Sequence, residues 1–237
     1  MAGLDPATHL AILCGESHWR ADARRWVAGP LSDSVRGPGH GEDRVTDISE
    51  RVRIEDVTVL SDNWYVLRKI TFSYRRNDGA WQKSEREAYD RGNGAAILLY
   101  NLAQRSVVLT RQFRMPAYMN GYRELLIEAA AGLLDDASPE DRIRAEAEEE
   151  TGYRVQDVRK IYETFMSPGS VTEKLHLFVA AYDAKAKAGD GGGIAGEGED
   201  IDVLEMPFRD ALAMMADGRI CDAKTIILLQ WAQMNLF

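Results

Sequence analysis

The sequence has few cysteines and histidines, and this scarcity excludes most metal centres built on those ligands. Only two cysteines and four histidines occur in 237 residues. Cys14 and Cys221 have neither zinc-site spacing nor the pattern of a disulfide framework. Three histidines lie at irregular intervals within the first forty residues, and we interpret them as surface residues. This cysteine usage is typical of a reducing compartment, so we expect a cytoplasmic protein.

The sequence also lacks long apolar runs. Its longest uninterrupted apolar stretches are short, such as residues 95–100, whereas a transmembrane helix needs roughly 20 residues. The amino terminus shows no basic region followed by an apolar run and a small-residue cleavage site. We therefore expect neither a membrane span nor a secretory signal.

Basic charge is in deficit. The chain carries 29 basic and 38 acidic side chains, a net charge of −9. Because phosphate backbones require a basic surface, this balance argues against general nucleic-acid binding. A small phosphorylated substrate stays compatible with it if metal ions mediate the contact. The hydrophobic content of 45% and charged content of 28% are ordinary for a globular protein, and the length favours one domain with an appendage.

The chain divides into three parts by pattern. Residues 1–44 contain several Gly–Pro breaks, and we expect an accessory or partly disordered extension. Residues 45–91 form a β-rich subdomain in which Asn77-Asp78-Gly79 marks a hairpin turn. Residues 92–237 combine strands with helices, so we expect an α/β or α+β sandwich with a mixed sheet.

The expected elements follow from periodicity and turn signals. A Gly-rich and Ala-rich linker at 185–200 is expected to be mobile. Strands are expected at 57–60, 64–74, 81–89, 95–100, 106–113, 155–165, 175–182 and 202–205, and helices at 138–152, 207–216 and 223–234.

The densest chemical signal lies near the end of the first of these helices. Ser138 is a good N-cap and Gly152 a good C-terminal signal. Between them Glu146, Glu149 and Glu150 stand at i, i+3 and i+4, so their carboxylates share one face and repel one another. Such a face needs either open solvent or a cation, and hard oxygen ligands suit Mg²⁺ or Mn²⁺. From these residues alone, a solvated acidic face stays an open alternative.

Residues 132–153 resemble the Nudix box, G-x5-E-x7-R-E-U-x-E-E-x-G-U, where U is a bulky aliphatic residue. The three glutamates and the glycine that follows them match from the carboxyl end. The spacing is one residue short, Ser138 replaces the first Glu, Ala145 the Arg and Ala147 an aliphatic residue. Because that Arg normally helps to orient a metal-binding Glu, Glu146 must be oriented by the metal or by a neighbour such as Arg144 or Arg142.

From about residue 57 onward the chain resembles the GDP-mannose pyrophosphatase branch of the Nudix superfamily, close to the ADP-ribose pyrophosphatases. The resemblance implies a Nudix-type α/β/α sandwich and Mg²⁺-dependent hydrolysis of a nucleoside diphosphate sugar, with Mn²⁺ able to substitute. GDP-mannose is the first substrate candidate and ADP-ribose the alternative. A Nudix-fold module that binds a nucleotide without cutting it also stays open. The supporting strings are residues 60–64, 89–95, 111–114, 127–135, 166–173 and 199–205.

The resemblance also implies the metal and catalytic residues. Glu146 and Glu150 match the family's carboxylate ligands, and Ala131 offers a backbone carbonyl. Glu199, in the Gly-rich segment, supplies an additional carboxylate able to close over a substrate. Glu149 stands beside these ligands and completes the expected catalytic set.

The resemblance further implies substrate contacts and a dimer. Arg114 would pair with phosphate, although an ordinary surface arginine at a strand end is the alternative. In the family the β-rich amino-terminal part pairs with its counterpart in a two-fold dimer and contributes nucleotide contacts across the interface. We therefore expect a homodimer acting on a small nucleotide sugar. The expected substrate-binding residues are Trp64, Tyr65, Arg91, Arg114, Leu133, Glu173 and Lys224.

Overall fold

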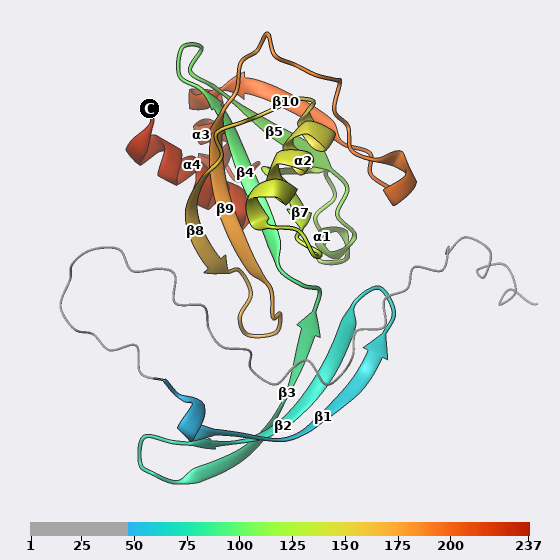
Figure 1. The fold of residues 1–237 in the computed structure, drawn as a ribbon, viewed down its shortest axis with the longest axis vertical. Helices are drawn as coiled ribbons and strands as arrows, with labels where there is room; N and C mark the ends of the chain where they lie inside the picture. The colour runs from blue at the N-terminus through green and yellow to red at the C-terminus, as the bar shows by residue number, and fades with distance from the viewer. Residues whose placement is uncertain (1–46) are drawn as a thin grey trace, which may run out of the picture. The chain divides into compact units, whose positions relative to one another are not determined.

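The fold is taken from a computed structural model that describes residues 47–237, apart from the side chain of Glu197 (Figure 1). The extension expected at residues 1–44 lies outside the described residues. Within residues 47–237, no helix combines the length and apolar character needed to cross a membrane.

The amino-terminal strands form a separate antiparallel sheet. A short 3-10 turn, η3 (Ser49–Arg51), leads into β1 (Val52–Asp62), β2 (Val66–Arg75) and β3 (Trp81–Asp90), which pair in the order β1-β2-β3. The expected hairpin joins β2 to β3, and Gly79 adopts a φ of 85° that side-chain-bearing residues rarely accept. Residues 53–60 of β1 are exposed throughout, so little of the chain covers this sheet.

A seven-stranded mixed sheet forms the body of the fold. Its main path runs β10-β5-β4-β9-β8, with β6 paired to β5 and β7 paired to β4. The central pair β4 and β9 is parallel and the other pairs are antiparallel, which confirms the expected mixed sheet. The strands are β4 (Gly94–Asn101), β5 (Ser106–Gln112), β6 (Leu126–Glu128), β7 (Ala130–Leu133), β8 (Arg159–Phe165), β9 (Lys174–Ala181) and β10 (Asp202–Pro207).

Helices cover both faces of this sheet. Along β4 the side chains alternate, so Ile97 packs in one core with Ile143 of α2 (Pro139–Thr151). Leu98 packs in a second core with residues of α3 (Phe208–Ala216) and α4 (Ala223–Asn235), such as Leu228. Figure 1 shows α2 in yellow and the pair α3 and α4 in red. The expected α/β/α sandwich is therefore confirmed.

Two local features differ from the expectations. A short helix, α1 (Met115–Met119), lies between β5 and β6, where five residues are too few to give a periodic signal. Residues 126–128 and 130–133, which are assigned to no element from the sequence, form two strands, because β6 pairs with β5 whereas β7 pairs with β4.

The first half of the linker expected at 185–200 is hydrogen-bonded to the end of α2. The amide of Ala188 donates to the carbonyl of Gly152 at 2.7 Å, and the amide of Gly192 donates to the carbonyl of Glu150 at 2.9 Å. A Cβ on Gly191 would lie 2.5 Å from that same Glu150 oxygen. The glycines here permit close approach of two backbones, which their composition alone does not distinguish from flexibility.

Candidate active site

The helix α2 begins and ends at its expected signals, and one of its faces packs against the sheet. Ser138 has extended backbone angles, and its hydroxyl accepts a hydrogen bond from the amide of Asp141 at 3.1 Å. Gly152 ends the helix at a φ of 76°. The face towards the sheet carries Ile143 and Ala147 together with two glutamates, Glu146 and Glu150.

These two glutamates are buried, which shows that the alternative of a solvated acidic face is wrong for them. Glu146 is 4% exposed and Glu150 is 1% exposed. Burial and the neighbouring charges of Glu146 and Glu199 together raise the pKa of Glu150 to about 8. The Oε2 atom of Glu150 is buried without a hydrogen-bond partner. A carboxylate pair in this state is unfavourable for the protein alone and attractive to a cation.

Gly132 makes room for one of these carboxylates. A Cβ placed on Gly132 would overlap the side chain of Glu146, far inside the 3.0 Å that real Cβ atoms keep from other atoms. Gly132 follows Ala131 on β7, so the carboxylate of Glu146 lies against the strand that carries the expected carbonyl ligand. The glycine of the box is therefore required by close contact.

Arg142 contacts Glu146 from the preceding turn of α2. Its guanidinium forms an ion pair with Glu146 across one turn of α2, and the two side chains are 28% and 5% exposed. Arg144 instead contacts exposed Asp141 at 3.2 Å and the carbonyl of Gln156. Of the two neighbours left open by the sequence, the structure selects Arg142. Ala145 lines a surface groove with Arg144 and stands apart from this pair.

The other two expected catalytic glutamates lie at the same end of α2 or in the segment that is hydrogen-bonded to it. The amide of Gly193 donates to the carbonyl of half-buried Glu149 at 3.1 Å. Glu199 accepts a hydrogen bond from the amide of Ile194 at 2.9 Å, and its charge acts on Glu150. The fastened Gly-rich segment thus brings Glu199 towards the end of α2.

The donor set fits a magnesium ion. Among the described residues, no three His, Cys, Asp or Glu side chains are gathered closely enough to hold a metal by themselves. Mg²⁺ is usually bound by one or two carboxylates together with water and substrate phosphates, so a complete protein cage is not needed. The unpartnered oxygen of Glu150 and the space that Gly132 leaves for Glu146 meet that requirement.

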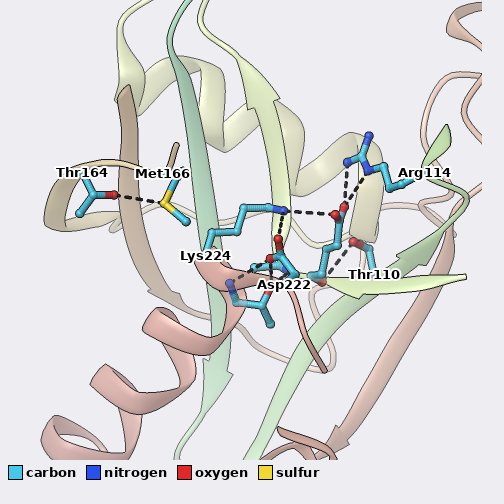
Figure 2. A network of polar contacts seen from close by, with 9 residues as sticks. Thr110, Arg114, Thr164, Met166, Asp222 and Lys224 are labelled. Carbon is cyan, nitrogen blue, oxygen red and sulfur yellow. Dashed lines mark hydrogen bonds and ion pairs between the residues drawn. The ribbon is translucent and has the colours of Figure 1, made fainter. Parts of the chain in front are cut away.

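Two expected phosphate-binding side chains meet on a buried carboxylate (Figure 2). Arg114 donates through Nε and Nη2 to Oε2 of Glu128 at 3.0 and 2.7 Å. Lys224 lies 3.3 Å from Oε1 of Glu128 and 3.0 Å from Oδ1 of Asp222. Burial lowers the pKa of Arg114, but the charges of Glu128, Glu150 and Asp222 outweigh it and hold the pKa above its usual value. Arg114 is therefore part of the carboxylate-rich site.

Glu128 and Asp222 were missed in the sequence. Glu128 is 3% exposed at the end of an apolar strand, and a buried charge in that setting has a partner. An acidic residue in an apolar strand was therefore the one signal in the sequence for a paired, buried charge. The sequence does not identify Arg114 and Lys224 as its partners.

A second group gathers most of the remaining expected residues around Arg91. The Nε atom of Arg91 lies 3.4 Å from Oε1 of Glu173, and its guanidinium lies 5.4 Å from the ring centre of Tyr65. Trp64 packs edge to face on Tyr65 and is 80% exposed. The group contains an exposed aromatic surface next to an ion pair, which suits the planar base and polar sugar of a nucleotide.

The Arg91 group and the strand that contacts Glu146 adjoin at Gly94, the first residue of β4. A Cβ on Gly94 would lie 3.2 Å from the carbonyl oxygen of Gly132 and 3.4 Å from Oε1 of Glu173. Leu133 pairs with Gly94 across the ladder between β4 and β7. The structure therefore places the Arg91 group next to the strand that contacts Glu146.

Comparison with known proteins gives a consistent family. Residues 51–89 match the model of the GDP-mannose pyrophosphatase NudK N-terminal domain. The chain is 54% identical over 186 residues to the GDP-mannose pyrophosphatase of Pectobacterium atrosepticum, covering 78% of this chain and 95% of that protein. It is 55% identical over 178 residues to that of Cronobacter sakazakii, covering 75% and 92%. The corresponding protein of Yersinia pestis is 54% identical over 189 residues, with coverages of 78% and 94%.

The fold has a solved counterpart as well. A crystal structure described as an ADP compounds hydrolase superposes with a TM-score of 0.59 at 16% sequence identity. The match covers 78% of this chain and 96% of that one. At this identity the likeness concerns the fold.

Proposed function

We propose that this chain, which belongs to the GDP-mannose pyrophosphatase family of Nudix hydrolases, hydrolyses GDP-mannose to GMP and mannose 1-phosphate. The observation that carries the proposal is the burial of Glu146 and Glu150 side by side on α2. The Oε2 atom of Glu150 has no hydrogen-bond partner. A module that only binds a nucleotide has no need to bury two repelling carboxylates at such a site. The enzyme is therefore favoured over the non-catalytic alternative.

The carboxylates of Glu146 and Glu150 would hold Mg²⁺, with the carbonyl of Ala131 and the carboxylate of Glu199 as additional ligands. Mn²⁺ would substitute because it accepts the same oxygen donors. When bound, the metal supplies positive charge that offsets the charge on the two phosphates as the bond between them breaks. Glu149 and Glu199 would accept a proton from the attacking water.

Substrate phosphates would bind Arg114 and Lys224, because phosphates are negatively charged and these two cations meet at one carboxylate. Arg91 and Glu173 would orient the polar end groups, Tyr65 and exposed Trp64 would stack on the base, and Leu133 would line the site. Binding along this path fixes the pyrophosphate relative to the carboxylates, and such positioning supplies much of the rate enhancement in phosphoryl transfer. The residues proposed to bind substrate are Trp64, Tyr65, Arg91, Arg114, Leu133, Glu173 and Lys224.

A panel of nucleotide sugars tests the substrate assignment. With saturating Mg²⁺, we expect kcat/KM for GDP-mannose to exceed that for ADP-ribose and for other nucleoside diphosphate sugars. A higher value for ADP-ribose would transfer the assignment to that alternative. Tight binding of GDP-mannose without turnover of any compound would establish the binding module instead.

The ion pair between Arg142 and Glu146 leads to a prediction on metal use. Arg142→Gln removes the cation that orients Glu146, so we expect kcat at low Mg²⁺ to fall about tenfold, equivalent to about 1.4 kcal/mol. Excess Mg²⁺ should restore most of the loss, because the metal then orients Glu146. Arg144→Gln, on the same helix, is the matched control and should leave the Mg²⁺ titration unchanged. Equal titrations for the Arg142 variant and the unmodified enzyme would show that Glu146 is oriented without Arg142.

Residues 45–91 are proposed to form a dimerisation subdomain, and residues 92–237 the hydrolase domain. Ile54, Val57 and Val59 on β1 are each at least half exposed, and an uncovered apolar strand is an aggregation hazard unless it meets a partner. We expect a homodimer by light scattering at micromolar concentration, retained after removal of residues 1–44. A fully active monomer would refute this proposal.

The cytoplasm is the proposed compartment. Cys221 is a free, exposed cysteine. An exposed thiol persists in reducing surroundings, where disulfides are rare. Finding the mature protein in an oxidising compartment would contradict this placement.

A further inference from the structure

The buried carboxylate of Glu128 contacts two cations, one through each oxygen. Oε2 receives both donors of Arg114, and Oε1 faces the ammonium of Lys224. The side chain of Glu128 is 4% exposed, whereas that of Arg114 is 40% exposed. The carboxylate is therefore shielded from solvent, whereas part of the Arg114 side chain is accessible from the solvent side.

The two cations come from distant parts of the chain. Arg114 precedes α1, and Lys224 lies in the first turn of α4. Figure 2 shows both side chains converging on one place from different elements. Ordering two such long, rotamer-rich side chains costs conformational entropy, and Glu128 is a partner that both of them contact.

The start of α4 is itself fastened to the strand of Glu128. Asp222 is the N-cap of α4 and accepts from the amide of Thr225 at 3.0 Å, while its other oxygen contacts Lys224. The hydroxyl of Thr225 accepts a hydrogen bond at 2.7 Å from the amide of Ala129, the residue after Glu128. The position of Lys224 is thus set from both sides, by Asp222 on its own helix and by Glu128 on β6.

A contribution to stability alone does not explain this arrangement. Burying an ion pair removes charged groups from water, and replacing it by apolar residues is often neutral or stabilising. An acid next to an anion site also weakens anion binding by simple charge. Glu128 is compatible with the site if the geometry it imposes on Arg114 and Lys224 matters more than the charge it adds.

We propose that Glu128 is a positioning residue, which fixes Arg114 and Lys224 in the relative geometry that a pyrophosphate group requires. The inference rests on the proposed function only for the identity of the substrate. Glu128 acts through the two cations and does not itself touch the substrate.

The first test uses Glu128→Gln in the full chain. We expect kcat for GDP-mannose to fall at least about tenfold per folded enzyme and KM to rise, because small misplacements of binding groups carry large penalties. We also expect weaker binding of inorganic pyrophosphate in metal-free buffer by calorimetry, although the variant site is more positive. Glu163→Gln is the matched control, since Glu163 also bridges two cations, Lys160 and Lys174, outside the site. Unchanged or tighter pyrophosphate binding by the Glu128 variant would overturn the proposal.

The second test asks whether Glu128 acts only through its cations. In the unmodified chain, Glu128→Gln should lower Tm, because it leaves two cations without their partner. In the Arg114→Met, Lys224→Met background it should raise Tm, because it removes a buried acid that no longer has one. A drop in Tm in both backgrounds would show a purely structural role. This thermal readout and the pyrophosphate measurement hold even if the protein fails to hydrolyse GDP-mannose, so failure of the function is distinguishable.

Discussion

Replacing Glu150 by glutamine should reduce kcat for GDP-mannose by about three orders of magnitude while the fold is kept. The charge that a metal supplies at a phosphoryl group is worth several kcal/mol, and about 1.4 kcal/mol corresponds to tenfold in rate. Glutamine preserves the shape of Glu150 and removes the negative charge that binds the metal. The measurement is kcat at saturating Mg²⁺ and substrate, scaled to folded protein.

The Tm of the Glu150→Gln variant distinguishes a loss of catalysis from a loss of folded protein. Glu150 is buried beside Glu146 and its pKa is raised to about 8, so in the metal-free protein glutamine changes the charge little at neutral pH and relieves repulsion above pH 8. We therefore expect Tm without metal to stay equal or rise. Glu148→Gln is the matched control, because Glu148 lies on the same helix and pairs with exposed Arg154. If the Glu150→Gln variant kept more than a tenth of the kcat, Glu150 would not be a metal ligand.

Gly132→Ala should reduce kcat about a hundredfold. The added methyl group would occupy the space of the Glu146 side chain, so either that carboxylate or β7 must move. Displacing a catalytic group by about 1 Å is enough for a loss of this size. Steady-state kinetics on GDP-mannose would measure it, together with circular dichroism to confirm that the sheet is intact.

Gly169→Ala provides the comparison for this variant. A Cβ there meets nothing within 4 Å, and the backbone is not in the left-handed region, so the same substitution should be silent. If Gly132→Ala were as active as Gly169→Ala, Glu146 would have to tolerate displacement, and its assignment as a metal ligand would be wrong.

The helix of the site was predictable from the sequence because its signals are local. Ser138, Gly152 and the spacing of the glutamates all act within a few residues, and the structure confirms the caps. The sequence could not decide whether the acidic face was solvated, because burial depends on what packs against the helix. The strand at 95–100 was predictable from its continuous apolar run. Such a run is typical of a strand that is buried on both faces, and every residue of Ala95–Leu99 is fully buried.

Contacts between distant segments were not predictable. Glu128 lies 14 residues from Arg114 along the chain, and its contact with Lys224 joins β6 to α4. No spacing rule links such positions. The hydrogen bonds between the Gly-rich segment and α2 were not predictable for a related reason: a glycine that permits flexibility and a glycine that permits close backbone contact have the same sequence signal. Arg142 was one of two candidates, and only the direction of its side chain separates it from Arg144.

The central claim is that buried carboxylates of α2 support metal-dependent cleavage between the two phosphates of GDP-mannose. Phosphorus NMR of GDP-mannose incubated with the purified protein tests it most directly. With Mg²⁺, the pyrophosphate signals should be replaced by those of GMP and mannose 1-phosphate, and EDTA should stop the conversion until Mg²⁺ is restored. Conversion at the same rate in EDTA, or release of GDP and free mannose, would contradict the account.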